Sequence, residues 1–256
     1  MPSQLIFFIL LRTTNEKVMK VVTVISSTYR MGLYLLKLSS AIHNLKLDIL
    51  MCNTGAFTSN RVKDQLLLSY LDNVDDNELI FFTDGYDTFF MAGEDEIVQK
   101  FHRFKTDLVF STETQCWPDP EQASLYPAGV ISPYKYLNSG GFIGRAGFIK
   151  EILNDDSFYE VDGDDKFSYS NQYLWTKRYF KDTSAIRLDT ACELFCTFSP
   201  ETGNEFYKDG DEGIHDSMYV SLKREWFKTN FAINEGRMLN RMTGTQPCNA
   251  HFNGNS

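Results

Sequence analysis

Two aspartates follow an apolar run in the segment LIFFTDGYDTFF, which spans residues 79–90. Asp84 and Asp87 stand three positions apart, and paired carboxylates are ligands that divalent cations accept. The dipeptide Asp84-Gly85 is equally a strong signal for a tight hairpin turn between two strands. The segment by itself therefore leaves two interpretations open, a metal-binding site or a turn.

The elements around this segment predict an α/β fold. Short runs of β-branched and aromatic residues predict strands, and apolar residues at every third or fourth position predict helices between them. The predicted strands are 21–26, 47–52, 79–83 and 107–112, and the predicted helices are 33–45, 62–71 and 97–104. This alternation implies right-handed crossovers and a largely parallel sheet, whose ligands bind beyond the carboxyl ends of the strands. Asp84 directly follows one such strand, so it lies where a ligand crevice is expected.

The second half of the chain is less regular. It contains a helical pattern near residues 169–180, several shorter runs typical of strands, and two acidic stretches at 155–165 and 209–216. Acidic runs of this kind are usually solvated loops. No repeat or linker divides the chain, so we expect one domain over residues 20–256 after an amino-terminal extension at 1–19.

Composition limits the possible partners. The formal net charge of −9 over 256 residues argues against nucleic acid, because phosphate backbones attract proteins rich in lysine and arginine. An acidic protein that binds a phosphate ligand needs a metal cation to bridge the two. The five cysteines lack the paired spacing of zinc ribbons and redox motifs, which favours buried, reduced thiols. The apolar segment at 5–11 is too short to span a membrane and lacks the flanks of a signal peptide, so the compartment stays open.

Four longer segments resemble one known family. They are FTDGYDTFFMAG (82–93), STETQCWPDP (111–120), KYLNSGGFIG (135–144) and NQYLWTKRY (171–179). In order and spacing they resemble the glycosyltransferase domain of the multifunctional procollagen lysyl hydroxylases, over about residues 21–254, and LNSGGFIG is the most specific block. The resemblance implies a single-domain GT-A glycosyltransferase fold, an α/β fold with a mostly parallel central sheet flanked by helices and a smaller, irregular, β-rich second half.

The resemblance assigns residues to a metal and to a nucleotide-sugar donor. It implies that Asp84, Asp87 and His251, the last within HFNG, hold the metal. Taken alone, His251 would more often be an ordinary surface histidine. The residues that the resemblance places around the donor are Ser26, Arg61, Tyr86, Asn138, Ser139, Gly140, Gly141, Asn253 and Gly254.

A divalent cation suits the chemistry that the resemblance implies. Transfer from a UDP-sugar releases a diphosphate whose charge an acidic protein cannot neutralise alone. Two carboxylates and one imidazole suit Mn²⁺ better than Zn²⁺, because Zn²⁺ favours more nitrogen and sulfur ligands. As a Lewis acid, the ion would stabilise the charge that grows on the departing UDP.

The catalytic candidates lie where the sequence departs from the family. The family has a run of aspartates directly before the glutamine that corresponds to Gln172, whereas this chain has SYSN at 168–171. Asn171 takes the position of the last aspartate, and Asp164 and Asp165 lie seven or eight residues before Gln172, where only a rerouted loop would bring them into the site. A retaining transferase can let the leaving phosphate take the acceptor's proton. In that case Asn171 and Gln172 bind the sugar and stabilise the developing oxocarbenium.

Plain structural roles compete with these assignments. Trp117 matches a tryptophan of the family's sugar site, but beside Pro118 it serves equally well as a core aromatic. Gln172 serves equally well as an exposed helix residue. The glycines of the LNSGGFIG block serve close packing just as readily, since their spacing is not the dinucleotide-binding fingerprint.

The sequence thus predicts a Mn²⁺-dependent retaining transferase that moves glucose from UDP-glucose to galactosyl-hydroxylysine of collagen or collagen-like chains. The sugar, the acceptor and a place in the secretory pathway come from the resemblance alone. Two alternatives stay open, a UDP-galactose-dependent hydroxylysine galactosyltransferase and a UDP-sugar-binding module with little turnover. The acidic stretch at 155–165 would attract a cationic acceptor chain if it lay beside the crevice.

Overall fold

The structure, a computed structural model, describes residues 19–52, 59–160, 166–167, 169–198 and 224–253. Several residues of the sequence analysis lie outside these ranges, namely Asp164, Asp165, Gly254, the apolar segment at 5–11 and the acidic stretch at 209–216. The described residues contain the other candidates for the metal and donor sites.

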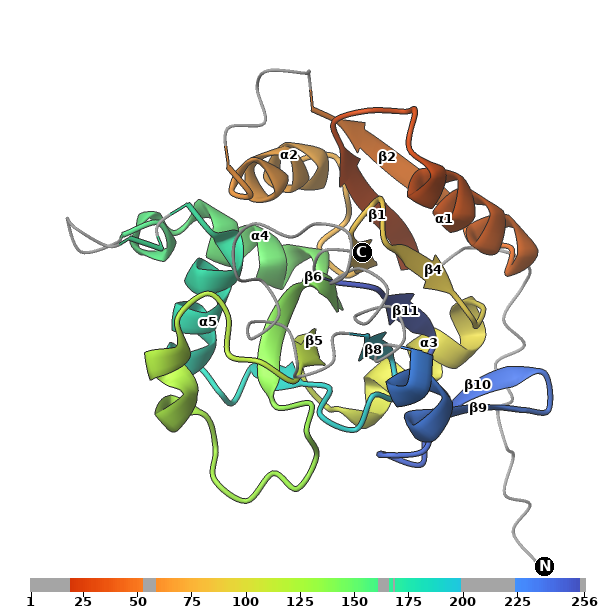
Figure 1. The fold of residues 1–256 in the computed structure, drawn as a ribbon. Helices are drawn as coiled ribbons and strands as arrows, with labels where there is room; N and C mark the ends of the chain where they lie inside the picture. The colour runs from red at the N-terminus through yellow and green to blue at the C-terminus, as the bar shows by residue number, and fades with distance from the viewer. Residues whose placement is uncertain (1–18, 53–58, 161–165, 168, 199–223, 254–256) are drawn as a thin grey trace, which may run out of the picture.

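A six-stranded sheet forms the centre of the molecule (Figure 1), in the order β2, β1, β3, β6, β5, β7. Its strands are β1 (Met19–Ile25), β2 (Leu47–Met51), β3 (Leu79–Thr83), β5 (Leu108–Glu113), β6 (Tyr136–Arg145) and β7 (Ile186–Leu188). Neighbouring strands pair in parallel, except that β6 runs antiparallel to both β3 and β5. The predicted mostly parallel sheet is confirmed, with one reversed strand.

Strand β6 begins at the edge of the sheet where its neighbours end. Its register sets Gly141 beside Thr83, at the end of β3, and Asn138 beside Ser111, near the end of β5. The first part of the LNSGGFIG block, residues 137–141, therefore lies at the carboxyl ends of two parallel strands. The sequence pattern cannot reveal the reversal, because residues 137–144 are all buried and show no polar alternation.

Helices cover both faces of the sheet (Figure 1). They are α1 (Met31–Ile42), α2 (Val62–Leu71), α3 (Glu94–Arg103), α4 (Ala146–Asn154) and α5 (Asn171–Lys181), with 3-10 turns η1 (Pro120–Leu125) and η2 (Asp156–Phe158) and a helix at 224–230. Adjacent residues of β3 face opposite ways, since Phe82 packs with α2, α4 and α5 and Phe81 packs with α1 and α3. Within the described ranges, none of the helices has both the length and the apolar character that crossing a bilayer requires.

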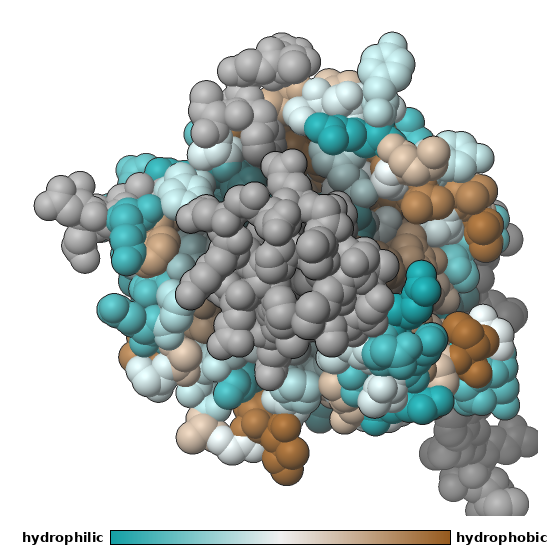
Figure 2. Space-filling model, in the orientation of Figure 1, coloured by the Kyte–Doolittle hydropathy of each residue, from teal (hydrophilic) through white to brown (hydrophobic). Residues whose placement is uncertain are grey.

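Helix α1 carries apolar side chains on its outer face as well as its inner face. Leu33 and Leu36 are buried, whereas the exposed apolar residues are Met31, Tyr34, Leu35, Leu38 and Ile42. Figure 2 shows apolar surface over this helix. Apolar spacing extends the predicted helix to Leu45, but the helix ends at Ile42 and Asn44 adopts a φ of 55°.

A second, three-stranded sheet joins distant parts of the chain. Its strands are β4 (Thr88–Phe90), β8 (Phe195–Thr197) and β11 (Asn249–His251), and a separate hairpin pairs β9 (Phe231–Asn234) with β10 (Arg237–Asn240). Strand β11 lies in the middle, antiparallel to β4 and parallel to β8, and its register pairs His251 with Thr88. Because β3 and β4 belong to different sheets, the interpretation of Asp84-Gly85 as a hairpin turn is wrong.

Lys100 of α3 fixes the segment that leads into β11. Its ammonium group donates to the main-chain oxygens of Glu193 and Gln246, at 2.9 and 2.6 Å, and pairs with Glu96 at 2.8 Å. The side chain is only 10% exposed, so these groups replace water as its partners. Because Gln246 precedes β11, the contact helps to position His251.

Replacing Lys100 with methionine should lower the free energy of unfolding by about 2–3 kcal/mol, because buried oxygens lose their donor. Urea denaturation measures the change. The control is Lys46→Met, since Lys46 is 76% exposed and lies 3.7 Å from Asp48, and it should alter stability by less than about 0.5 kcal/mol. Equal losses in the two variants would contradict this role for Lys100.

Candidate metal and donor site

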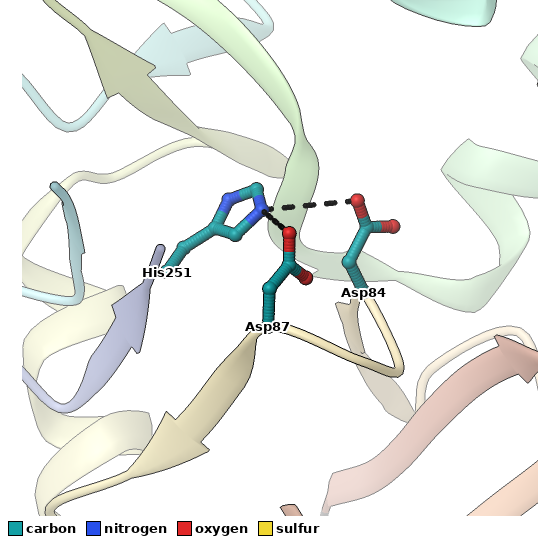
Figure 3. Close-up of side chains that lie close together, drawn as sticks. All are labelled: Asp84, Asp87 and His251. Atoms are coloured by element: carbon teal, nitrogen blue, oxygen red, sulfur yellow. Dashed lines mark ion pairs between the residues drawn. The ribbon is translucent and has the colours of Figure 1, made fainter. Parts of the chain in front are cut away.

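Asp84, Asp87 and His251 converge although His251 lies far along the chain from the loop that carries the two aspartates (Figure 3). One ligand atom from each lies within 4.8 Å of the others. His251 Nε2 is 3.3 Å from Asp87 Oδ2 and 3.8 Å from Asp84 Oδ2. Asp84 follows β3, Asp87 precedes β4 and His251 ends β11, so the two sheets meet at these side chains.

The backbone brings β6 and the residue after β11 against this loop. Asp84 N donates to Gly140 O at 2.8 Å, and Phe252 N donates to Asp87 O at 2.8 Å. The close approach requires a glycine, since a Cβ at Gly140 would lie 2.3 Å from His251 Cε1 and 2.8 Å from Asp84 Oδ2. Any side chain at this position would fill the space beside the carboxylate and the imidazole that a cation would need.

Asn138 sets the tautomer of His251. Its Oδ1 accepts the main-chain N–H of Gly140 at 3.1 Å and lies 3.2 Å from His251 Nδ1. Because this oxygen acts as an acceptor, Nδ1 carries the hydrogen and Nε2 faces the carboxylates. Histidine ligands of metals are commonly oriented in this way, by a hydrogen bond from the second ring nitrogen.

The charges of the three side chains depend on one another. Burial alone lowers the pKa of His251, but the hydrogen bond and charge of Asp87, with the charge of Asp84, outweigh it and raise the pKa above its ordinary value. Burial raises the pKa of Asp87, but the hydrogen bond and charge of His251 outweigh it and lower the pKa. Two ionised carboxylates beside one imidazole make an electronegative site, where a cation would replace the imidazole proton.

Lys63 of α2 lies beside the same carboxylates. Its Nζ is 2.6 Å from Asp84 Oδ1, and the two side chains are only 16% and 21% exposed. Lys63 pairs with Oδ1 of Asp84, whereas Oδ2 of Asp84 is the oxygen that faces His251. Two carboxylates and one imidazole fit a divalent cation that accepts oxygen and nitrogen ligands.

Asp84 and Asp87 lie where two cavities meet, and His251 lies on the wall of the larger one. The larger cavity, of about 380 Å³, and the smaller one, of about 240 Å³, share Asn60, Lys63, Asp84 and Asp87 in their walls. The wall of the smaller cavity continues with Val24, Ser26, Gly85 and Tyr86, and that of the larger with Glu113, Gln115, Trp117, Asn138, Ser139, Gly140, Asn171, Gln172, His251 and Asn253. A cation at the junction would contact the middle of a ligand whose two ends occupy the two cavities.

Glu113 organises the larger cavity. Its Oε1 accepts from Gln172 Nε2 at 2.6 Å, and its Oε2 accepts from Asn253 Nδ2 at 2.7 Å. Gln172 Oε1 in turn accepts the main-chain N–H of Ser139 at 3.1 Å. Burial raises the pKa of Glu113 to about 7, although the hydrogen bonds of Gln172, Asn138 and Asn253 favour the ionised form. Glu113 therefore changes charge near neutral pH.

A comparison with protein families decides which kind of protein carries this site. The model of one family, described as the PLOD GT domain, matches residues 15–256. The chain belongs to this family. Membership of the PLOD GT domain family makes the chain a glycosyltransferase, and it confirms the predicted resemblance and the predicted class of fold.

Relatives of this PLOD GT domain occur in animals and in a giant virus. The chain is 30% identical over 190 residues to an uncharacterized protein of Acanthamoeba polyphaga mimivirus, covering 73% of this chain and 34% of that protein. It is 31% identical over 164 residues to procollagen-lysine,2-oxoglutarate 5-dioxygenase 2 of Homo sapiens, covering 63% and 21%. It is 38% identical over 117 residues to the multifunctional procollagen lysine hydroxylase and glycosyltransferase LH3 of Homo sapiens, covering 46% and 15%. The chain thus spans about a third or less of the length of these relatives.

This PLOD GT domain gathers most of the predicted site residues around the two cavities. They are Asp84, Asp87, His251, Ser26, Tyr86, Asn138, Ser139, Gly140, Trp117, Asn171, Gln172 and Asn253. Gly141 packs inward, since a Cβ there would lie 2.8 Å from the ring of Phe195. Arg61 lines neither cavity, and its guanidinium lies 5.4 Å from the centre of the Tyr159 ring, next to η2.

The exposed fractions of three side chains exclude the purely structural roles that the sequence leaves open for them. His251 is 4% exposed, so it is not a surface histidine. Gln172 is 5% exposed and bonded at both ends of its amide, so it is not an ordinary exposed helix residue. Trp117 is 46% exposed and lines the larger cavity, so it is not a core aromatic.

Sequence analysis does not assign six of the cavity residues to the site, namely Val24, Asn60, Lys63, Gly85, Glu113 and Gln115. A signal for Glu113 exists, since it ends β5 in the way that Asp84 follows β3, and ligands bind at the carboxyl ends of parallel strands. The signal for Lys63 is weaker, because a lysine in the first turn of a helix is usually a solvated residue.

Replacing Asp87 with alanine should abolish Mn²⁺-dependent binding of UDP while the fold persists, because the site loses a ligand and also a repelling charge. Isothermal titration calorimetry with UDP, in Mn²⁺ and in EDTA, measures this. The control is Asp107→Ala, since Asp107 is half exposed beside Arg145 and precedes β5 at the opposite end of that strand. An Asp87→Ala variant with the parent's affinity and metal response would contradict the site.

The pH dependence of stability tests the burial of Glu113. Its folded pKa of about 7 lies above the ordinary 4.5, so its contribution is complete below pH 4.5 and is lost as the pH rises to 7. The loss is about 3 kcal/mol, since one pKa unit corresponds to about 1.4 kcal/mol. Urea denaturation between pH 4.5 and 8 should therefore give a flatter stability curve for Glu113→Gln than for the parent chain. Parallel curves would contradict the raised pKa.

Proposed function

We propose that this chain is a Mn²⁺-dependent retaining hexosyltransferase that moves glucose from UDP-glucose to galactosyl-hydroxylysine of collagen or collagen-like chains. The observation that carries the proposal is the convergence of Asp84, Asp87 and His251 at the junction of two cavities. The layout of a nucleotide-sugar matches this arrangement, because its diphosphate lies between a nucleoside and a sugar as the metal ligands lie between the two cavities. We infer that the smaller cavity receives the nucleoside and the larger one receives the sugar.

Asp84, Asp87 and His251 would hold the cation, which when bound supplies Lewis acidity to the leaving diphosphate. Lys63 would add a second positive charge on the other side of Asp84. In the smaller cavity, the Tyr86 hydroxyl accepts the main-chain N–H groups of Ser26 and Ser27, at 2.8 and 2.6 Å. These bonds hold the Tyr86 ring in place as a wall for the nucleoside.

Residues of the larger cavity would position the sugar and stabilise its developing positive charge. Gln172 is fixed by three contacts, to Glu113, to Ser139 and to the main-chain oxygen of Trp117 at 2.9 Å. Preorganised polar groups of this kind lower the barrier because they need no rearrangement as charge develops. With the leaving phosphate as proton acceptor, the site needs no separate general base. Trp117, half exposed at the cavity wall, offers an apolar face to a hexose.

The choice of acceptor is supported by the names of the relatives, whereas the choice of glucose as the donor sugar follows from the family resemblance alone. One of them carries both hydroxylase and glycosyltransferase in its name, together with procollagen lysine. By the same relationship we place the activity in the secretory pathway. A binding module with little turnover is the second candidate, because Asn171 stands where the family has an aspartate.

The test is a transfer assay with UDP-glucose and UDP-galactose, each offered hydroxylysine and galactosyl-hydroxylysine peptides, with and without Mn²⁺. The proposal expects Mn²⁺-dependent transfer of glucose to the galactosylated peptide. Transfer of galactose to hydroxylysine would change the proposed donor and acceptor but would still support a metal-dependent hexosyltransferase. Metal-dependent UDP binding without release of UDP from either donor would favour the binding module.

Alanine at Trp117 or Gln172 should reduce kcat at least about tenfold while leaving the affinity for UDP within about twofold, because these residues act on the sugar. Steady-state kinetics and UDP titrations separate the two effects. Tyr34→Ala serves as the control for loss of an exposed aromatic, since Tyr34 lies on the outer face of α1. Equal losses in kcat and UDP affinity would move Trp117 and Gln172 to the nucleotide side.

A further inference from the structure

A buried carboxylate lies directly behind the sugar part of the larger cavity. Asp64, in the first turn of α2, is 2% exposed. Its Oδ1 accepts from Trp175 Nε1 at 3.1 Å and from Asn171 Nδ2 at 3.4 Å. Both donors come from α5, one helical turn apart, so Asp64 connects α2 to the helix that carries the sugar-side residues.

The Asn171 amide takes its orientation from this contact. Because Nδ2 points towards Asp64, Oδ1 points the other way, where Ser139 Oγ lies at 3.4 Å. Asn171 and Ser139 both line the larger cavity, and Asp64 stands one side chain behind them. The Asp64 carboxylate is therefore connected to the cavity wall through one amide, that of Asn171.

A purely structural connection between α2 and α5 would not need a charged side chain at position 64. Its Oδ2 is buried, and no hydrogen-bond partner for that atom is found among the described residues. Two donors on Oδ1 would be satisfied equally well by a neutral amide, without the cost of burying a charge. Burial raises the pKa of Asp64 to about 6, while the bonds from Trp175 and Asn171 and the charges of Lys63 and Arg61 favour the ionised form. These partners oppose the effect of burial on the carboxylate.

We propose that Asp64 is a positioning residue of the sugar site, whose carboxylate supplies through Asn171 the negative charge that residues 168–171 lack. The inference rests on the proposed function, because the charge matters only where a sugar becomes cationic. An anion fixed behind the amide polarises it and stabilises the positive charge that grows on the sugar ring as UDP departs. Asp64 itself does not contact the substrate.

The decisive variant is Asp64→Asn. An asparagine side chain keeps the oxygen that accepts both donors and places its nitrogen where the unpartnered oxygen lies. We expect kcat for sugar transfer to fall at least about tenfold, with the donor KM and the Kd for UDP within about twofold of the parent. We expect the thermal midpoint to stay equal or to rise, because a buried charge is removed.

Two further variants separate charge from structure. The double variant Asp64→Asn/Asn171→Asp exchanges the two side chains and returns a carboxylate to the cavity wall, so it should recover much of the lost kcat. Trp175→Phe removes the indole N–H from Asp64 together with part of a buried core ring, so it should lower stability and leave kcat near the parent value. If Asp64→Asn does not fold, the double variant decides the matter, since near-parent kcat supports the proposal and background activity overturns it.

The outcomes distinguish this inference from the proposed function. An active parent chain together with Asp64→Asn at an unchanged kcat would overturn the inference alone. Loss of kcat that follows a fall in the thermal midpoint, with no recovery in the double variant, would make Asp64 merely structural and overturn it as well. A parent chain that releases no UDP from either donor in Mn²⁺ would contradict the proposed function, and the inference with it.

Discussion

The pairing of β11 with β4 is the contact on which the candidate site depends. It joins the end of the described chain to the segment that follows the central strand β3, and its register sets His251 against the residue after Asp87. Without this ladder, Asp84 would keep Lys63 as its partner, and Asp87 would lose the imidazole of His251. With it, an imidazole completes a set of three ligands in a place that β6 and Gly140 keep open.

Burial of negative charge at this edge of the sheet is the energetic consequence. Each carboxylate there is compensated differently, Asp84 by Lys63, Asp87 by His251, Glu113 by two amides and Asp64 by an indole and an amide. Charges removed from water without partners would each cost several kcal/mol, so these pairings let the fold tolerate them. Of these four carboxylates, only Asp84 and Asp87 form a cluster with a third metal ligand, the imidazole of His251. A cation is therefore favoured at that point.

Much of the fold follows from the sequence, because local patterns carry it. The buried run before Asp84 and the stretch with apolar residues at every third or fourth position that forms α2 are both where the pattern places them. The start of α3 is missed by three residues, since Glu94, Asp95 and Glu96 form a first turn with no apolar spacing to mark it. Carboxylates suit that turn because they face the positive end of the helix dipole.

The site is only partly predictable, because long-range pairing decides it. Resemblance to a family, not spacing, connects His251 with the two aspartates. The reversed direction of β6 and the inward positions of Lys63 and Asp64 come from tertiary packing that no local pattern encodes. Glu113 is the exception, since its place at the end of a parallel strand is a signal that sequence analysis can use.

The most direct test of the central claim is a crystal structure with Mn²⁺ and UDP, with the metal located by its anomalous scattering. The account predicts one peak within about 2.0–2.6 Å of a carboxylate oxygen of Asp84, one of Asp87 and Nε2 of His251, with the diphosphate against it and the uracil towards Tyr86. Ordered UDP with no anomalous peak among these three side chains, or with a metal held elsewhere, would contradict it.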